Sequence, residues 1–155
     1  MRKFLTLLAI GLAIARPADA ASSATTKRTV AALRAFGILN APLALDCSIR
    51  LEQGGRRWMY GALTGEQPVF IARTAQGYTS WLILEARRIA DEKLRIVLAG
   101  RGTEKRWEIV LHRLPHGTYR TFRSAPLGNE HVLSVENGLY VESHRPTPPL
   151  QRCRE

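Results

Sequence analysis

Apolar and polar residues change their spacing at Pro42. Before this proline, Val30, Leu33 and Phe36 recur every three residues, which places them on one face of a helix. Gly37 follows directly and is well placed to end that helix. After Pro42, apolar residues alternate with polar ones, which is the period of a strand with one buried face. The pattern therefore predicts a short helix followed by a β-domain.

The alternating part of the chain divides into about eight or nine short strands, with turn residues roughly every 10–14 positions. The predicted strands are 43–52, 57–62, 69–74, 78–87, 93–98, 106–111, 118–123, 131–136 and 139–143. Asn137 and Gly138 separate the last two and favour a type I′ turn, because both tolerate positive φ.

None of the intervening segments can form a helix long enough for a parallel crossover, so consecutive strands should pair antiparallel. We expect an all-β fold, a small antiparallel meander barrel (lipocalin/calycin-like) of about eight strands with a short N-terminal helix. A two-sheet β-sandwich is the alternative. The proline-rich tail, 145–155, should run back across the barrel.

The first twenty residues have the three parts of a secretory signal peptide. Arg2 and Lys3 give a positive start, residues 4–15 are apolar, and Ala-Asp-Ala at 18–20 is a small-x-small cleavage site. The apolar run is shorter than the roughly 20 residues that span a bilayer. The alternative to a signal peptide is a buried N-terminal helix. We expect cleavage after residue 20, and a periplasmic or secreted protein with no transmembrane segment.

Three regions follow from these patterns: a signal peptide at 1–20, a flexible leader and short helix at 21–42, and a single β-domain at 43–155. The chain has two cysteines, Cys47 and Cys153. In an oxidising compartment such a pair is most simply one disulfide, and neither cysteine has the context of a reactive thiol. In the chain-entropy model, a disulfide that closes a loop of roughly 100 residues stabilises the folded state by about 4–5 kcal/mol.

The formal charge is +10. Without residues 1–20, the remaining 135 residues carry 20 basic and 12 acidic side chains, or +8. This charge favours anionic partners such as lipid headgroups, lipopolysaccharide or acidic polysaccharide. The basic residues are scattered, as on a solvated surface, and we expect no specific nucleic-acid binding.

Aromatic residues at strand positions allow two interpretations. They fill a core, or they line a barrel mouth that binds an apolar or amphipathic molecule and is ringed by arginines, among them Arg87 and Arg88. The second interpretation gives the candidate ligand-binding residues Trp58, Tyr60, Trp81, Trp107, Arg57 and Arg106.

The histidines do not predict a metal site or a catalytic centre. His112 and His116 have the spacing of helical metal ligands, but Pro115 lies between them in a strand-like segment. His131 and His144 lie near opposite ends of the last hairpin. We therefore expect no catalytic residues, no metal and no cofactor. The available acidic residues are Glu85, Glu104, Glu108, Glu136 and Glu142. Most of them lie at strand positions beside arginines, where exposed cross-strand ion pairs are expected.

Two short motifs resemble a known family. They are Leu-Asp-Cys-Ser at 45–48, preceded by Phe-Gly-Ile-Leu at 36–39, and Pro-Thr-Pro-Pro-Leu-Gln-Arg-Cys at 146–153. The chain resembles small uncharacterised secreted bacterial proteins with an N-terminal Asp-Cys-Ser and a C-terminal Thr-Pro-x-x-x-Arg-Cys. This resemblance implies an exported β-rich domain with paired cysteines, and it implies no activity. Those proteins usually carry Gly-x-Trp shortly before Asp-Cys, where this chain has Asn-Ala-Pro-Leu at 40–43.

These observations favour an exported, non-catalytic binding or interaction domain for an amphipathic or anionic molecule. One alternative is an inhibitor of an envelope or foreign enzyme, which would project an ordered loop around 100–105 or 124–130. The other is a small hydrolase or isomerase, which would need His112, His131 or His144 beside a carboxylate in a pocket.

Overall fold

The computed structural model describes residues 17–62, 66–128 and 132–154. Its elements in chain order are α1 (Pro17–Phe36), β1 (Leu43–Ala44), η1 (Leu51–Gln53), β2 (Arg57–Gly61), β3 (Val69–Thr74), β4 (Gly77–Ala90), β5 (Lys93–Gly100), β6 (Arg106–Arg113), η2 (Pro115–Gly117), β7 (Tyr119–Pro126), β8 (Val135–Glu136), β9 (Leu139–Tyr140) and β10 (Gln151–Arg152). The η elements are single 3₁₀ turns.

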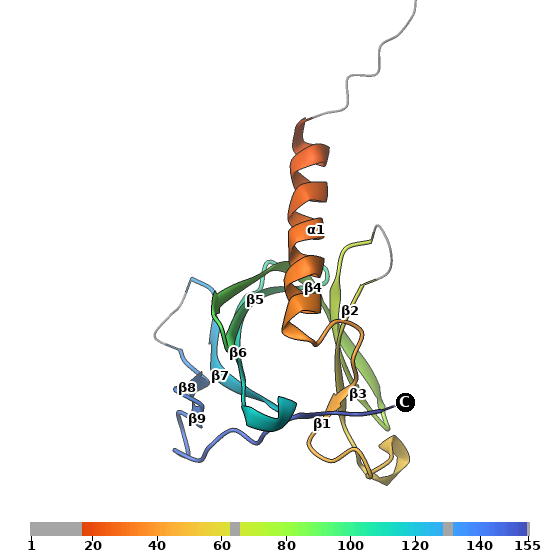
Figure 1. Cartoon of the computed structure of the whole chain (residues 1–155), viewed down its shortest axis with the longest axis vertical. Helices are drawn as coiled ribbons and strands as arrows, with labels where there is room; N and C mark the ends of the chain where they lie inside the picture. Colours follow the sequence, from red (N-terminus) through yellow and green to blue (C-terminus); the bar gives the residue numbers. More distant parts are fainter. Residues whose placement is uncertain (1–16, 63–65, 129–131, 155) are drawn as a thin grey trace, which may run out of the picture.

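The strands of the described residues form one antiparallel sheet in the order β10-β1-β2-β3-β4-β5-β6-β7-β8-β9. Strands β2 to β7 have five or more residues each, and the other four have two. The sheet curls into a half-barrel (Figure 1), so the expected all-β fold with one helix is confirmed. Neighbours in sequence are neighbours in the sheet from β1 to β9, as expected for a meander.

The tail bridges the two sides of this curl. Leu150 exchanges two backbone hydrogen bonds with Tyr119 of β7, with N···O distances of 2.8 and 2.6 Å. The next two residues form β10, which pairs with both residues of β1. A disulfide between Cys47 and Cys153, with 5.4 Å between the Cα atoms, then fixes the end of the tail. The predicted return of the tail and the predicted disulfide are both confirmed.

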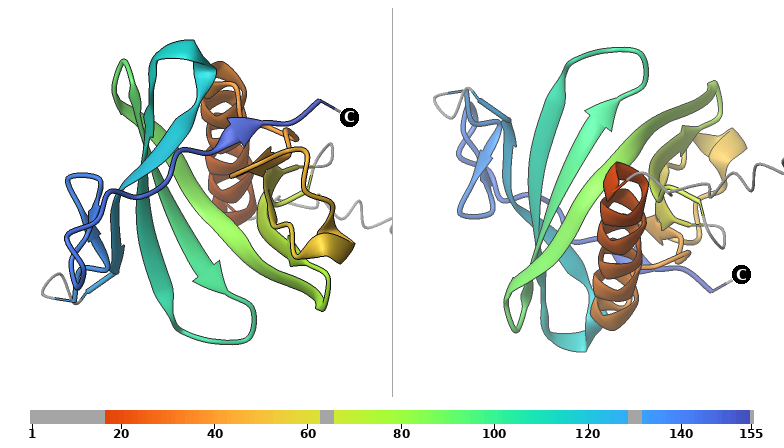
Figure 2. Two further views of the ribbon diagram at one scale, coloured as in Figure 1. Left: turned by 90° about the horizontal axis from the view of Figure 1, so that it is seen from below. Right: turned by 90° about the horizontal axis from the view of Figure 1, so that it is seen from above.

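Helix α1 packs along β4 (Figure 2) and brings Leu33 and Phe36 into the core. Gly37, at φ 85°, ends the helix as predicted, because a positive φ lets the last carbonyls accept hydrogen bonds from Gly37 and Ile38. The helix begins at Pro17 and so includes 21–26, the segment expected to be a flexible leader. Apart from Pro17 at its first position, helix α1 contains no proline or glycine, and it is rich in alanine, so nothing in the sequence interrupts it before Phe36. Within the described ranges, no helix is both long and apolar enough to cross a membrane.

The strand predicted at 43–52 was wrong beyond Ala44. Asp46 Oδ1 accepts hydrogen bonds from the Ser48 backbone N–H at 2.8 Å and the Ser48 hydroxyl at 2.7 Å. These local bonds compete with a strand ladder and turn the chain into a loop that leads to η1. The Asn137–Gly138 turn is as predicted, with φ of 51° and 79°.

Candidate functional site

The predicted aromatic residues lie on the inner side of the curl. Trp58, Trp81 and Trp107 are partly buried against the hydrophobic core, and Tyr60 is 3% exposed. The indole N–H of Trp107 donates to Ser124 Oγ at 2.6 Å. The structure thus places all four residues in core packing, and none of them lines the groove described below.

The predicted arginines do not gather around these aromatic residues. Arg57 donates to the backbone carbonyls of Cys47 at 3.1 Å and Ile49 at 2.8 Å, so its guanidinium holds the loop after β1. Arg106 is exposed at the start of β6. Arg87 and Arg88 form exposed ion pairs, with Glu85 and Asp91 respectively.

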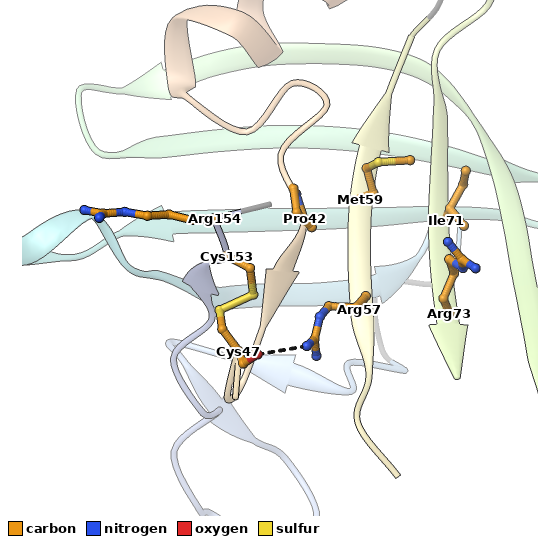
Figure 3. Close-up of a pocket in the computed structure, with 8 residues that line it drawn as sticks. All are labelled: Pro42, Cys47, Arg57, Met59, Ile71, Arg73, Cys153 and Arg154. Atoms are coloured by element: carbon orange, nitrogen blue, oxygen red, sulfur yellow. Dashed lines mark hydrogen bonds between the residues drawn. A yellow bond between two sulfur atoms is a disulfide. The ribbon is translucent and has the colours of Figure 1, made fainter. Parts of the chain in front are cut away.

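A groove of about 280 Å³ lies on the outer face of β2 and β3, against the disulfide (Figure 3). Its lining comprises three largely apolar side chains, the disulfide and three arginines: Pro42, Met59, Ile71, Cys47, Cys153, Arg57, Arg73 and Arg154. Of the residues predicted to bind a ligand, only Arg57 belongs to it. The groove lies on the outer face of the sheet beside the closing tail, so it is a surface site and is not a barrel lumen. Its residues come from segments that are far apart in the sequence.

The strand register places two arginines opposite each other on this outer face. Arg57 pairs with Arg73 across β2 and β3, and the next pair on the same face is Met59 with Ile71. Like charges directly opposite each other on a sheet destabilise it. Among the ion pairs of the described residues, none involves either arginine. Because Arg57 is held by carbonyls and Arg73 is exposed, Arg73 is the cation most available to an anion.

Cys47 is the one residue of the Asp46-Cys47-Ser48 motif that lines the groove. The Ser48 hydroxyl, and then the Ser48 backbone N–H, lower the pKa of the Asp46 carboxyl, and the charge of Arg57 adds to the effect although desolvation opposes it. Figure 3 shows Arg57 turned toward the Cys47 carbonyl. The motif therefore orients the cysteine that meets the tail.

The remaining candidate chemistry is dispersed. His112 lies in β6, His116 in η2 and His144 after β9, whereas His131 is outside the described residues. No group of three possible metal ligands occurs in the described part of the chain. Among the expected acids, Glu85 and Glu108 form three cross-strand ion pairs: Arg95 with Glu108 at 2.6 Å, Arg95 with Glu85 at 3.3 Å, and Arg123 with Glu108 at 3.8 Å.

Of the two loops that an inhibitor was expected to project, around 100–105 and 124–130, the first is an exposed turn and the second begins inside a strand. Residues 101–105 form an exposed turn, whereas 124–126 belong to β7 and 129–130 lie outside the described residues.

No family model, curated protein sequence or solved structure matches this chain. The chemistry of the groove is therefore the basis for a function.

Proposed function

We propose that this chain is an exported, non-catalytic binding domain that holds an amphipathic anion in the outer groove. The observation that supports this proposal is the position of the Arg57–Arg73 pair beside the Met59–Ile71 pair on one face. An anionic group beside Arg73 relieves the repulsion between the two guanidinium groups and accepts charge-assisted hydrogen bonds. The apolar part of the ligand covers Met59 and Ile71, which removes their surface from water.

Two features of the chain support export from the cytoplasm. Residues 1–20 resemble a signal peptide, and the Cys47–Cys153 disulfide persists in an oxidising compartment. We propose a periplasmic or secreted protein, in agreement with the resemblance of its two motifs to a secreted family. The formal charge of +8 that remains without residues 1–20 attracts anions toward the surface of the protein.

The size of the groove limits what it encloses. Ligand pockets for drug-sized molecules usually have about 300–1,000 Å³. At about 280 Å³, this groove accommodates a headgroup and the first part of an apolar chain. Geranyl phosphate, a ten-carbon chain with one phosphate, is a suitable probe, and geraniol and inorganic phosphate each supply half of its chemistry.

The test is isothermal titration of the oxidised protein with these three compounds. We expect geranyl phosphate to bind and the other two to bind much more weakly. Arg73→Gln should lower the affinity for geranyl phosphate about fivefold, which is the upper range for one exposed charge pair. Arg145→Gln is the matched control, because Arg145 is exposed and does not line the groove. Equal loss of affinity in both variants, or geraniol binding as tightly as its phosphate ester, would contradict the proposal.

A further inference from the structure

The cross-strand pair of arginines in the groove continues onto β4. Arg57 lies opposite Arg73 across β2 and β3, and Arg73 lies opposite Tyr78 across β3 and β4. Residues directly opposite each other in a sheet point to the same face, so Tyr78 follows Arg73 on the outer face. Tyr78 does not line the groove, and at 72% it is the most exposed large hydrophobic residue in the described part of the chain. An aromatic side chain in water therefore extends the outer face beyond the groove.

The loop at 45–56 lies at the same end of the sheet. Its 3₁₀ turn, η1, packs against β3, and Figures 1 and 2 show it beside the turn between β3 and β4. The Gly55 N–H donates to the Arg50 carbonyl at 2.9 Å, which folds the loop back on itself. Leu45 and Ile49 in this loop are 48% and 41% exposed. Exposed apolar side chains of the loop and of β4 thus border the groove at one end of the sheet.

The same end carries an excess of positive charge. Arginines outnumber acidic residues by four to two in the loop and the first arginine pair: Arg50, Arg56, Arg57 and Arg73, with Asp46 and Glu52. Arg50, Arg56 and Arg73 are exposed. Among the ion pairs that the described residues form, none includes any of the four arginines. This end of the outer face therefore complements a surface of negative charge.

A second exposed apolar cluster differs in its charge. Residues 139–141, which are 39–42% exposed, lie at β9, at one edge of the sheet. Glu136 and Glu142 flank them in the sequence, and both are exposed. Arg145 is nearby, since its carbonyl accepts from the Tyr140 N–H at 2.9 Å. Two carboxylates against one arginine disfavour an anionic surface there, so charge separates the two apolar clusters.

We propose that the groove end of the outer face docks on an anionic lipid bilayer, so that the amphiphile in the groove is a lipid of that bilayer. Tyr78 and Ile49 enter the headgroup region, where a ring with a hydroxyl meets apolar and polar groups together. Arg50, Arg56 and Arg73 contact lipid phosphates. This inference rests on the proposed function, because it names the source of the ligand that the groove holds.

The test is co-sedimentation of the oxidised protein with vesicles of phosphatidylcholine alone and of a mixture with phosphatidylglycerol, an anionic lipid. We expect strong binding to the mixture and much weaker binding to phosphatidylcholine. Arg56→Gln should lower the partition coefficient for the mixture about fivefold, the equivalent of one basic side chain near an anionic surface. Tyr78→Ser should lower it by a similar factor, because the ring no longer leaves water for lipid.

The controls keep lipid docking separate from binding in the groove. Neither Arg56 nor Tyr78 lines the groove, so both variants should bind geranyl phosphate as tightly as the unaltered protein, which also shows that they are folded. Arg145→Gln and Tyr140→Ser change the same residue types at the other apolar cluster and should retain vesicle binding. Residues 1–20 are the same in every variant, so their own affinity for lipid affects all of them alike.

Each outcome separates the two proposals. Equal binding to the two kinds of vesicle, or vesicle binding that persists in both Arg56→Gln and Tyr78→Ser, overturns lipid docking and leaves the groove as a site for a free amphiphile. Equal losses in the variants and their controls overturn it as well. If geranyl phosphate does not bind the unaltered protein, the proposed function fails, and a lipid in the groove fails with it.

Discussion

Cys47 and Cys153 are 106 residues apart in the sequence and are joined by a disulfide that ties the loop after β1 to the end of the tail. The two cysteines of this bond line the outer groove. Stability and binding are therefore coupled through one covalent link.

Replacing both cysteines by serine should lower the free energy of unfolding by about 4–5 kcal/mol, because the unfolded chain regains the entropy of an open loop of roughly 100 residues. Urea denaturation of the double variant and of the oxidised protein measures this difference. Reduction of the unaltered protein should lower its stability to a similar extent. Unchanged unfolding midpoints in both experiments would show that the tail is held in place without the bond.

Tyr119 connects the tail, β7 and the end of the helix. Its hydroxyl lies 3.3 Å from the Phe36 carbonyl oxygen and 3.4 Å from that of Gly37, and it donates to these acceptors. Tyr119→Phe should lower the free energy of unfolding by about 1 kcal/mol, the usual net contribution of a hydrogen bond. Tyr140→Phe is the matched control, because the Tyr140 side chain is 42% exposed. Equal stability of the two variants would contradict this role for Tyr119.

Gly138 occupies the second position of the type I′ turn at φ 79°. An added Cβ would lie 3.4 Å from Arg120 Cδ, in a backbone conformation that residues with side chains rarely adopt. Gly138→Ala should therefore cost about 1–2 kcal/mol. Asn137→Gly should be nearly neutral, since glycine tolerates the positive φ of this position. Thermal unfolding of both variants checks the contrast, and a stable Gly138→Ala would mean that the turn rearranges at little cost.

Asp46 should make the stability of the β1 loop depend on pH. Its hydrogen bonds to Ser48 lower its pKa from the ordinary 3.8, so the folded state binds the proton less readily than the unfolded state. The resulting stabilisation is fully present above 3.8 and is lost as the pH falls through the lower folded-state pKa.

The variant Asp46→Asn should consequently be less stable than the unaltered protein at neutral pH and equally stable in strong acid. Urea midpoints measured across this range show whether the two curves converge. Glu66→Gln removes an exposed carboxylate outside the loop and serves as the control. A constant difference between Asp46→Asn and the unaltered protein at all pH values would contradict the assignment.

Much of the fold could be predicted because its strands are buried on one face. The period of two in β2 to β7 reflects side chains that alternate between core and solvent, as with Trp58 and Met59 on neighbouring positions of β2. The loop after Ala44 was mispredicted because its apolar residues alternate in the same way. There, two hydrogen bonds from Ser48 to the Asp46 side chain override the pattern.

The groove could not be predicted from spacing alone. Its two sides come from segments about 100 residues apart, and they meet only because the tail pairs with β1. The opposition of Arg57 and Arg73 depends on the register of β2 and β3, which the length of the intervening turn does not specify. The prediction placed ligand binding among the tryptophans, whereas the structure assigns these residues to core packing.

Titrating isotopically labelled protein with geranyl phosphate, observed by two-dimensional ¹H–¹⁵N NMR, distinguishes the outer groove from the interior of the curl most directly. We predict that the backbone amide signals of Met59, Ile71 and Arg73 shift as ligand is added. The indole N–H signals of the three tryptophans should remain in place. Indole shifts without movement of the groove amides would contradict the central claim and place the ligand inside the curl.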